Sequence, residues 1–143
     1  MSCWRNAGPK QPVSDGVLDA SGLLAVMRQE RGAELVQSML LTDPLPWICT
    51  VNLSEVVAKL NDQFAMSEND IRTALRAMEF QVHDFDEDLA YRAAMLRSPT
   101  RAAGLGLGDR ACIALGMKLG VPVVTADRSW ATLGLPVEVI VIR

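Results

Sequence analysis

Four acidic side chains, Asp19, Glu55, Asp109 and Asp127, stand beside apolar segments of the sequence and could together hold metal ions. Mg²⁺ and Mn²⁺ prefer oxygen ligands, and carboxylates are common among them. A group of carboxylates without matching basic residues is electrostatically unfavourable, so it persists mainly where cations neutralise it. If the fold brings these residues together, they predict a site for a hard divalent cation.

The segments around these residues alternate between strand and helix patterns. Apolar runs predict strands at residues 16–18, 47–50, 80–83, 121–125 and 137–140. Apolar residues at helical spacing predict helices at 21–29, 32–41, 108–119 and 128–133, and three further helices with apolar positions within 56–64, 71–78 and 89–96. Strands separated by helices predict an α/β fold with a mainly parallel sheet.

The order of these elements predicts that the four carboxylates meet at one edge of the sheet. Asp19 directly follows the first strand, and Asp127 lies two residues beyond the end of the fourth. Glu55 lies early in the helix after the second strand. Asp109 opens a helix that a short turn joins to the fourth strand, so the start of this helix is level with the end of that strand. Ligands of parallel sheets bind outside the carboxyl ends of the strands, and we expect a binding site there.

Each carboxylate also has a purely structural interpretation. Asp19 and Asp127 are suitable N-caps for the helices that follow them. Asp109 would stabilise a helix start through the helix dipole. Glu55 would pair with Lys59 one turn later, an interaction worth about 0.3 kcal/mol. Taken singly these interpretations stay open, whereas the grouping of all four favours metal binding.

Four sequence blocks around the carboxylates resemble the signature blocks of PIN-domain ribonucleases. The blocks are residues 17–25 (VLDASGLLA), 52–56 (NLSEV), 104–115 (GLGLGDRACIAL) and 125–130 (TADRSW). They occur in the order and at the spacing of that family, between about residue 15 and the last residue given. Within the family, the sequence is most similar to the VapC toxins of type II toxin–antitoxin systems.

The resemblance implies a three-layer α/β/α PIN domain over residues 15–143, with a central sheet of roughly four or five strands. It implies that Asp19, Glu55, Asp109 and Asp127 form a catalytic acidic quartet. Asp19, Asp109 and Asp127 would hold Mg²⁺, or Mn²⁺ in its place, and Glu55 would complete the site and orient the attacking water. The implied reaction is hydrolysis of RNA phosphodiester bonds. The implied partners are a second copy of the chain and a small antitoxin with a basic segment that enters the active-site groove.

Polar neighbours of the quartet could support it or contact RNA. Thr125 would either orient a water in the site or simply end its strand, and Asn52 would either bond near the site or form a turn. Arg110 and Arg128 would either contact RNA phosphates or balance the nearby carboxylates. Gly106 stands where many relatives have Ser, a departure that changes hydrogen bonding near the site but leaves the quartet in place.

Composition fits one globular domain. The chain has 143 residues, half of them hydrophobic, and a net charge of −3. This charge weighs against a simple basic nucleic-acid module, although bound cations would offset it. Eleven of the 14 basic residues are arginine, the residue best suited to bidentate phosphate recognition. Residues 1–14 are expected to form a flexible tail, with an ordered arm as the alternative.

The sequence also indicates the compartment. No apolar run reaches the roughly 18 residues of a membrane-spanning helix, and the first residues lack the apolar core of a signal peptide. The three cysteines are scattered, which argues against a disulfide framework or a zinc site. We therefore expect a cytoplasmic protein.

Other motifs carry less weight. The single histidine, His83, is expected on the surface away from the carboxylates. The chain therefore lacks the second histidine that a mechanism based on a histidine pair needs. Trp130 and Cys112 are expected in the core. The Gly104–Gly108 segment lacks the preceding strand and the spacing of a dinucleotide site, and its glycines are expected to let the chain turn before Asp109.

Two rival functions remain at this point. A phosphatase of the haloacid-dehalogenase type would need a second aspartate two residues after Asp19, where this chain has Ser21. A catalytically silent module would bind an antitoxin or RNA without cleaving it. The intact quartet favours the metal-dependent ribonuclease over both.

Overall fold

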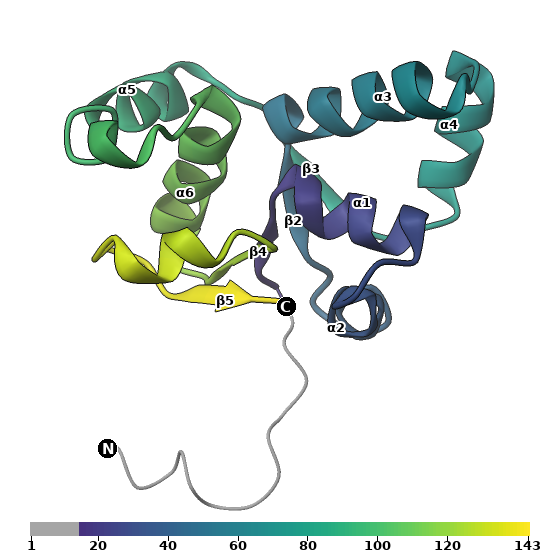
Figure 1. Cartoon of the computed structure of the whole chain (residues 1–143), viewed down its shortest axis with the longest axis horizontal. Coiled ribbons are helices and arrows are strands. Elements are labelled where there is room, and N and C mark those ends of the chain that lie inside the picture. The colour runs from purple at the N-terminus through teal and green to yellow at the C-terminus, as the bar shows by residue number, and fades with distance from the viewer. Residues whose placement is uncertain (1–14) are drawn as a thin grey trace, which may run out of the picture.

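The sheet is the centre of the molecule. The computed structural model describes residues 15–143, so the predicted tail of residues 1–14 lies outside the described residues. Five parallel strands pair in the order β3-β2-β1-β4-β5 (Figure 1). They are β1 (Val17–Leu18), β2 (Trp47–Cys49), β3 (Gln81–His83), β4 (Val123–Thr125) and β5 (Val139–Val141). The predicted α/β fold with a mainly parallel sheet is confirmed.

Helices cover both faces of this sheet. One core is shared by α1 (Ala20–Arg28), α2 (Ala33–Met39), α3 (Thr50–Phe64) and α4 (Glu68–Arg76), and the other by α5 (Glu87–Met95) and α6 (Leu107–Leu119). The short 3₁₀ helices η2 (Arg101–Ala103) and η3 (Arg128–Thr132) complete the described elements. Figure 1 shows the two groups of helices on opposite sides of β1 and β4. Within residues 15–143, no helix has the length and apolar character needed to cross a membrane.

Neighbouring residues of the central strands point into different cores. Val17 and Val123 pack with α5 and α6, whereas Leu18 and Val124 pack with the helices of the other face. All four side chains are fully buried. Burial on both faces explains why these strands read as continuous apolar runs rather than alternating ones. The result is the three-layer arrangement that the resemblance implied.

Each strand differs from its predicted range by one or two residues at an end, and one side chain differs in burial. Thr50 begins α3 instead of ending β2, β4 starts at Val123 rather than at residue 121, and the last strand starts at Val139 rather than at residue 137. Helix formation begins immediately after β2, so the early turns of α3 lie at the edge of the sheet. His83 is half-buried rather than on the surface, because its ring packs edge-on against Trp47 with the ring centroids 5.9 Å apart.

Candidate functional site

Asp19 is the most deeply held carboxylate of the quartet. It separates β1 from α1 and is the N-cap of that helix, where its Oδ1 accepts a hydrogen bond from the Gly22 amide at 3.0 Å. The Ser21 hydroxyl donates to the same oxygen at 2.6 Å, and the Thr125 hydroxyl donates to Oδ2 at 2.6 Å. Its side chain is buried, with 6% exposed. The structural interpretation as an N-cap is therefore correct, and both oxygens are oriented by hydroxyl groups.

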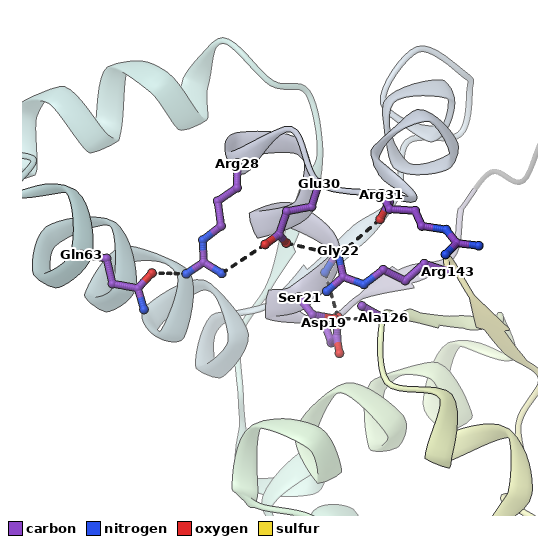
Figure 2. A network of polar contacts seen from close by, with 9 residues as sticks. All are labelled: Asp19, Ser21, Gly22, Arg28, Glu30, Arg31, Gln63, Ala126 and Arg143. Atoms are coloured by element: carbon purple, nitrogen blue, oxygen red, sulfur yellow. Dashed lines mark hydrogen bonds and ion pairs between the residues drawn. The ribbon is translucent and has the colours of Figure 1, made fainter.

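The same two hydroxyls tie Asp19 to the segment after β4. The Thr125 hydroxyl accepts a hydrogen bond from the Asp127 amide at 3.0 Å. The Ser21 hydroxyl accepts one from the Ala126 amide at 2.9 Å, and Figure 2 shows this second contact. Asp127 caps η3, and its Oδ1 accepts from both the amide and the hydroxyl of Ser129. The ends of β1 and β4 therefore form one hydrogen-bonded unit that carries two of the four carboxylates.

Asp109 lies in the first turn of α6 and is half-buried. Its Oδ2 accepts a hydrogen bond from the backbone amide of Gly106 at 3.2 Å. Gly106 is the N-cap of α6 in an extended conformation that any residue adopts, and a Cβ there would meet no atom within 4 Å. A serine would fit at this position and supply the side-chain cap that α6 lacks.

Glu55 approaches Asp109 from α3 across a contact with Gly108. A Cβ on Gly108 would overlap the Glu55 carboxylate, the end of a flexible side chain, so any other residue there would displace this carboxylate. The Asn52 side-chain amide donates to the Gly108 carbonyl at 2.9 Å and to Glu55 Oε1 at 3.3 Å. Asn52 is fully buried, and its Oδ1 has no hydrogen-bond partner among the described residues. Asn52 and Gly108 together position Glu55.

The four carboxylates influence one another electrostatically. Desolvation by burial is the main reason that the pKa values of Asp19, Glu55 and Asp109 are raised. The charge of Asp109 contributes to the raised pKa of Asp19 and of Glu55, and the charge of Asp127 contributes to that of Asp109. The four carboxylates thus lie along the carboxyl edge of the sheet, where the order of elements predicted them.

Basic residues do not neutralise this group. Among residues 15–143, no quartet carboxylate forms an ion pair, and the expected Glu55–Lys59 pair is absent. As the side chains stand, no three His, Cys, Asp or Glu side chains in the described chain lie close enough to hold a metal ion. The donor set nevertheless fits a hard cation, because it consists of oxygens whose negative charges lack partners and includes the unpartnered Oδ1 of Asn52.

The two arginines predicted beside the site have different placements. Arg110 is buried and donates to the Ala93 carbonyl of α5 at 2.9 Å, and its charge partly offsets the raised pKa of Asp109. Arg128 is exposed next to Asp127, and its Nε donates to the Arg143 carbonyl at 2.8 Å. Trp130 and Cys112 are buried in the core, as predicted.

Ser21 and Gly108 are the site residues that sequence reasoning missed. The only feature of the sequence that could have indicated a role for Ser21 is its spacing, two residues after a helix-capping aspartate. Gly108 was expected to serve a tight turn, but it lies within α6 and is required by close packing. Gly104 is the glycine of this segment that adopts a left-handed conformation, with φ of 69°.

A family comparison agrees with the fold. The model of the PIN domain matches residues 16–134, and the chain belongs to this family. PIN domains are generally nucleases, and PIN nucleases generally use divalent metal ions. No curated protein matches the chain.

Three solved structures similar to this chain are described as toxin–antitoxin or VapBC structures. A chain of the toxin–antitoxin complex from Klebsiella pneumoniae is 22% identical, with a TM-score of 0.69 over 90% of this chain and 98% of that chain. A chain of the DNA-bound VapBC complex from Salmonella typhimurium is 15% identical, with a TM-score of 0.69 over 92% and 100% of the two chains. A chain of VapBC-5 from Mycobacterium tuberculosis is 26% identical, with a TM-score of 0.56 over 92% and 99%. The first two neighbours show the same fold, and the VapBC-5 chain agrees with the sequence resemblance to VapC toxins.

Proposed function

We propose that the protein is a Mg²⁺-dependent endoribonuclease and the toxin of a type II toxin–antitoxin system. The observation that carries this proposal is the placement of four carboxylates from separate elements along one edge of the sheet, with no ion pair to any of them among residues 15–143. Structural ion pairs would place arginine or lysine beside such residues, whereas a cation site needs their charges available. Mn²⁺ is the expected substitute for Mg²⁺.

The members of the quartet have two roles in the proposal. Asp19, Asp109 and Asp127 hold the metal, and Glu55 completes the site and orients the attacking water. When bound, the metal supplies charge stabilisation for the phosphate and lowers the pKa of water. Ser21 and Thr125 keep both oxygens of Asp19 in a fixed orientation, because each oxygen accepts a hydroxyl hydrogen bond.

The histidine content favours hydrolysis over attack by the RNA's own 2′-hydroxyl. The 2′-hydroxyl route usually needs a histidine pair to move protons, and this chain has one histidine, His83. His83 ends β3, two strands away from β1, and its Nδ1 lies 2.9 Å from the Asp84 carbonyl. The proposed products are therefore a 5′-phosphate and a 3′-hydroxyl.

A cognate antitoxin with a basic segment is the proposed protein partner. An arginine from that segment would match the unpaired carboxylates and would compete with the cation. The similar toxin–antitoxin structures support this partner, and we also propose a homodimer that acts in the cytoplasm. Expression of the chain alone should arrest bacterial growth, and co-expression of a small protein encoded beside it should restore growth.

RNA cleavage tests the proposal directly. Purified protein should cleave end-labelled RNA in Mg²⁺, lose this activity in EDTA and regain it when Mg²⁺ or Mn²⁺ is added. The ends of the products should be a 5′-phosphate and a 3′-hydroxyl, and His83→Ala should retain most of the activity. A 2′,3′-cyclic phosphate, or undiminished cleavage in EDTA, would contradict the proposed chemistry. Soluble, folded protein that leaves RNA intact would favour the silent binding module.

A further inference from the structure

A second polar network lies on the α1 side of the molecule. Arg28 donates a hydrogen bond to the Gln63 side chain, and its Nη1 lies 3.9 Å from the Glu30 carboxylate (Figure 2). Arg143 reaches the other oxygen of Glu30 at 3.3 Å. The guanidinium groups of Arg28 and Arg143 therefore share the Glu30 carboxylate. This contact links the end of α1 to Arg143, which lies beyond the end of β5.

Two further arginines join this network through the backbone. The Arg143 guanidinium donates to the Arg31 carbonyl at 3.3 Å, and the Arg143 carbonyl accepts from Arg128 Nε at 2.8 Å. Arg128 directly follows Asp127 of the quartet. A series of contacts thus connects Arg128, beside the carboxylate edge, through Arg143 to Arg28 at the end of α1.

The side chains of this network carry more positive than negative charge. The network combines four arginines with the carboxylate of Glu30, in a protein whose net charge is −3. Arg31 and Arg128 are exposed, and neither forms an ion pair within residues 15–143. Exposed guanidinium groups without carboxylate partners suit a ligand that carries many phosphates.

An exposed aromatic ring stands at the far end of the network. The Arg28 guanidinium lies 6.0 Å from the centre of the Phe64 ring, and half of Phe64 is exposed. Surfaces that bind single-stranded nucleic acid combine arginines for the backbone with aromatic rings for the bases. Phe64 and the arginines supply both kinds of group in one continuous set of contacts.

We propose that Arg28, Arg31, Arg128 and Arg143 form an arginine surface that binds the phosphate backbone of single-stranded RNA, with Phe64 as a stacking position, and leads the strand to the quartet. This inference rests on the proposed function, since it names how that site receives its substrate. An alternative is that the network only fastens the end of β5 to α1. Fastening explains the contacts of Glu30 with Arg28 and Arg143, but it gives no role to the exposed guanidinium of Arg31.

Binding of RNA to charge-matched variants tests the surface. Arg31→Gln combined with Arg128→Gln removes two exposed arginines of the surface, and Arg72→Gln combined with Arg92→Gln removes two exposed arginines of α4 and α5. Both pairs change the net charge equally. The probe is a fluorescein-labelled single-stranded RNA of mixed sequence, bound in EDTA and followed by anisotropy at several salt concentrations. Circular dichroism and thermal unfolding check that both variants are folded.

The arginine surface predicts unequal results for the two variants. The Arg31/Arg128 variant should bind about tenfold more weakly at low salt, and the salt slope of log affinity should fall by about 1.4, or about 0.7 for each lost phosphate contact. The Arg72/Arg92 variant should stay within about twofold of wild type. Phe64→Leu should weaken binding about fivefold without changing the slope. Equal weakening by the two arginine pairs, or no weakening by the first, would overturn the inference.

A cleavage assay separates this inference from the proposed function. If wild-type protein cleaves RNA in Mg²⁺ but the Arg31/Arg128 variant binds RNA normally, the arginine surface is wrong and the nuclease assignment stands. If RNA binding depends on these arginines but no cleavage occurs in Mg²⁺ or Mn²⁺, the surface stands and the nuclease assignment fails. Absence of any RNA binding at low salt overturns the arginine surface.

Discussion

Asp19 and Glu55 belong to the same group of carboxylates, but the fold positions them in different ways. Asp19 is buried between two strands, and both of its oxygens accept hydroxyl hydrogen bonds. Glu55 is exposed, and its carboxylate is positioned by the side-chain amide of Asn52 and by Gly108, which has no side chain to displace it. One side of the site thus depends on hydrogen-bond donors, whereas the other depends on the space between two helices.

This difference indicates which substitutions are tolerated around Asp19 and which around Glu55. On the Asp19 side, a substitution that keeps a hydroxyl should preserve orientation, because the donor is what matters. On the Glu55 side, a substitution of Gly108 that adds even one carbon should displace the carboxylate, because both would occupy the same space. We call the hydroxyls of Ser21 and Thr125 the polar support of Asp19, and the space beside Gly108 the steric support of Glu55. The polar support accepts conservative substitution, whereas the steric support does not.

The largest expected effect comes from removing a carboxylate on the buried side. Asp19→Asn should reduce RNA cleavage in Mg²⁺ to background, while circular dichroism shows a folded protein. In metal-free buffer at neutral pH the variant should unfold at a higher temperature than wild type, because the buried charge is gone. Cleavage at the wild-type rate would exclude Asp19 from the site. An Asp70→Asn variant, changed at an exposed residue of α4, provides the control for general charge.

The steric support is tested by two glycines that stand two residues apart. Gly108→Ala should lower cleavage by about 10- to 100-fold, because its methyl group takes the place of the Glu55 carboxylate. Gly106→Ala should change activity by no more than about twofold, since the added carbon meets open space. Rates of cleavage under single-turnover conditions measure both. Similar losses in the two variants would show that Gly108 has no special role.

The polar support is tested at Thr125. Thr125→Val keeps the shape of the strand residue but removes the donor to Asp19 and the acceptor for the Asp127 amide. It should cost about 1–3 kcal/mol in the free energy of unfolding and should lower cleavage by about tenfold. Thr125→Ser should retain most of both. Chemical denaturation and cleavage rates distinguish these outcomes, and a fully active Thr125→Val variant would contradict the account of the Asp19 side.

A smaller effect is expected in the pH dependence of stability without metal. The raised pKa values of Asp19, Glu55 and Asp109 mean that the folded state binds protons more tightly than the unfolded state. Their stabilising contribution is therefore complete below the ordinary carboxyl pKa of about 4 and is lost as the pH rises through the raised values. The stability gained by Asp109→Asn should be larger at pH 7 than at pH 4. Thermal unfolding of both proteins in EDTA measures it, and an equal gain at the two pH values would refute the prediction.

The smallest effect is expected at the start of α6. Gly106→Ser adds a hydroxyl at an N-cap whose backbone is already extended, so the free energy of unfolding should rise by about 0.5 kcal/mol. Cleavage should remain within about twofold of wild type, because the quartet is unchanged. Denaturant unfolding with a matched Gly106→Ala variant separates the cap from the loss of glycine flexibility. A destabilised serine variant would show that the hydroxyl has no amide to cap.

Sequence reasoning predicted the order of elements well, because apolar runs and helix caps are local signals. Ser67 and Asp86 cap α4 and α5, and both are residue types that favour a helix N-cap. Sequence reasoning also predicted that the carboxylates lie along one edge, since the direction of parallel strands places their ends there. It could not find the contact between Gly108 and Glu55, which depends on how closely two helices pack. Nor could it find the inward turn of Arg110, because the sequence alone does not tell which side of α6 the arginine occupies.

Binding of Mn²⁺ to the metal-free protein tests the central claim, that these carboxylates form a cation site, most directly. Electron paramagnetic resonance counts free Mn²⁺ during a titration and needs neither an RNA substrate nor activity. Wild-type protein should bind Mn²⁺ saturably, Asp19→Asn and Asp109→Asn should each weaken binding at least about tenfold, and Asp70→Asn should leave it unchanged. Absence of saturable binding in wild type, or equal binding by Asp109→Asn, would contradict the account.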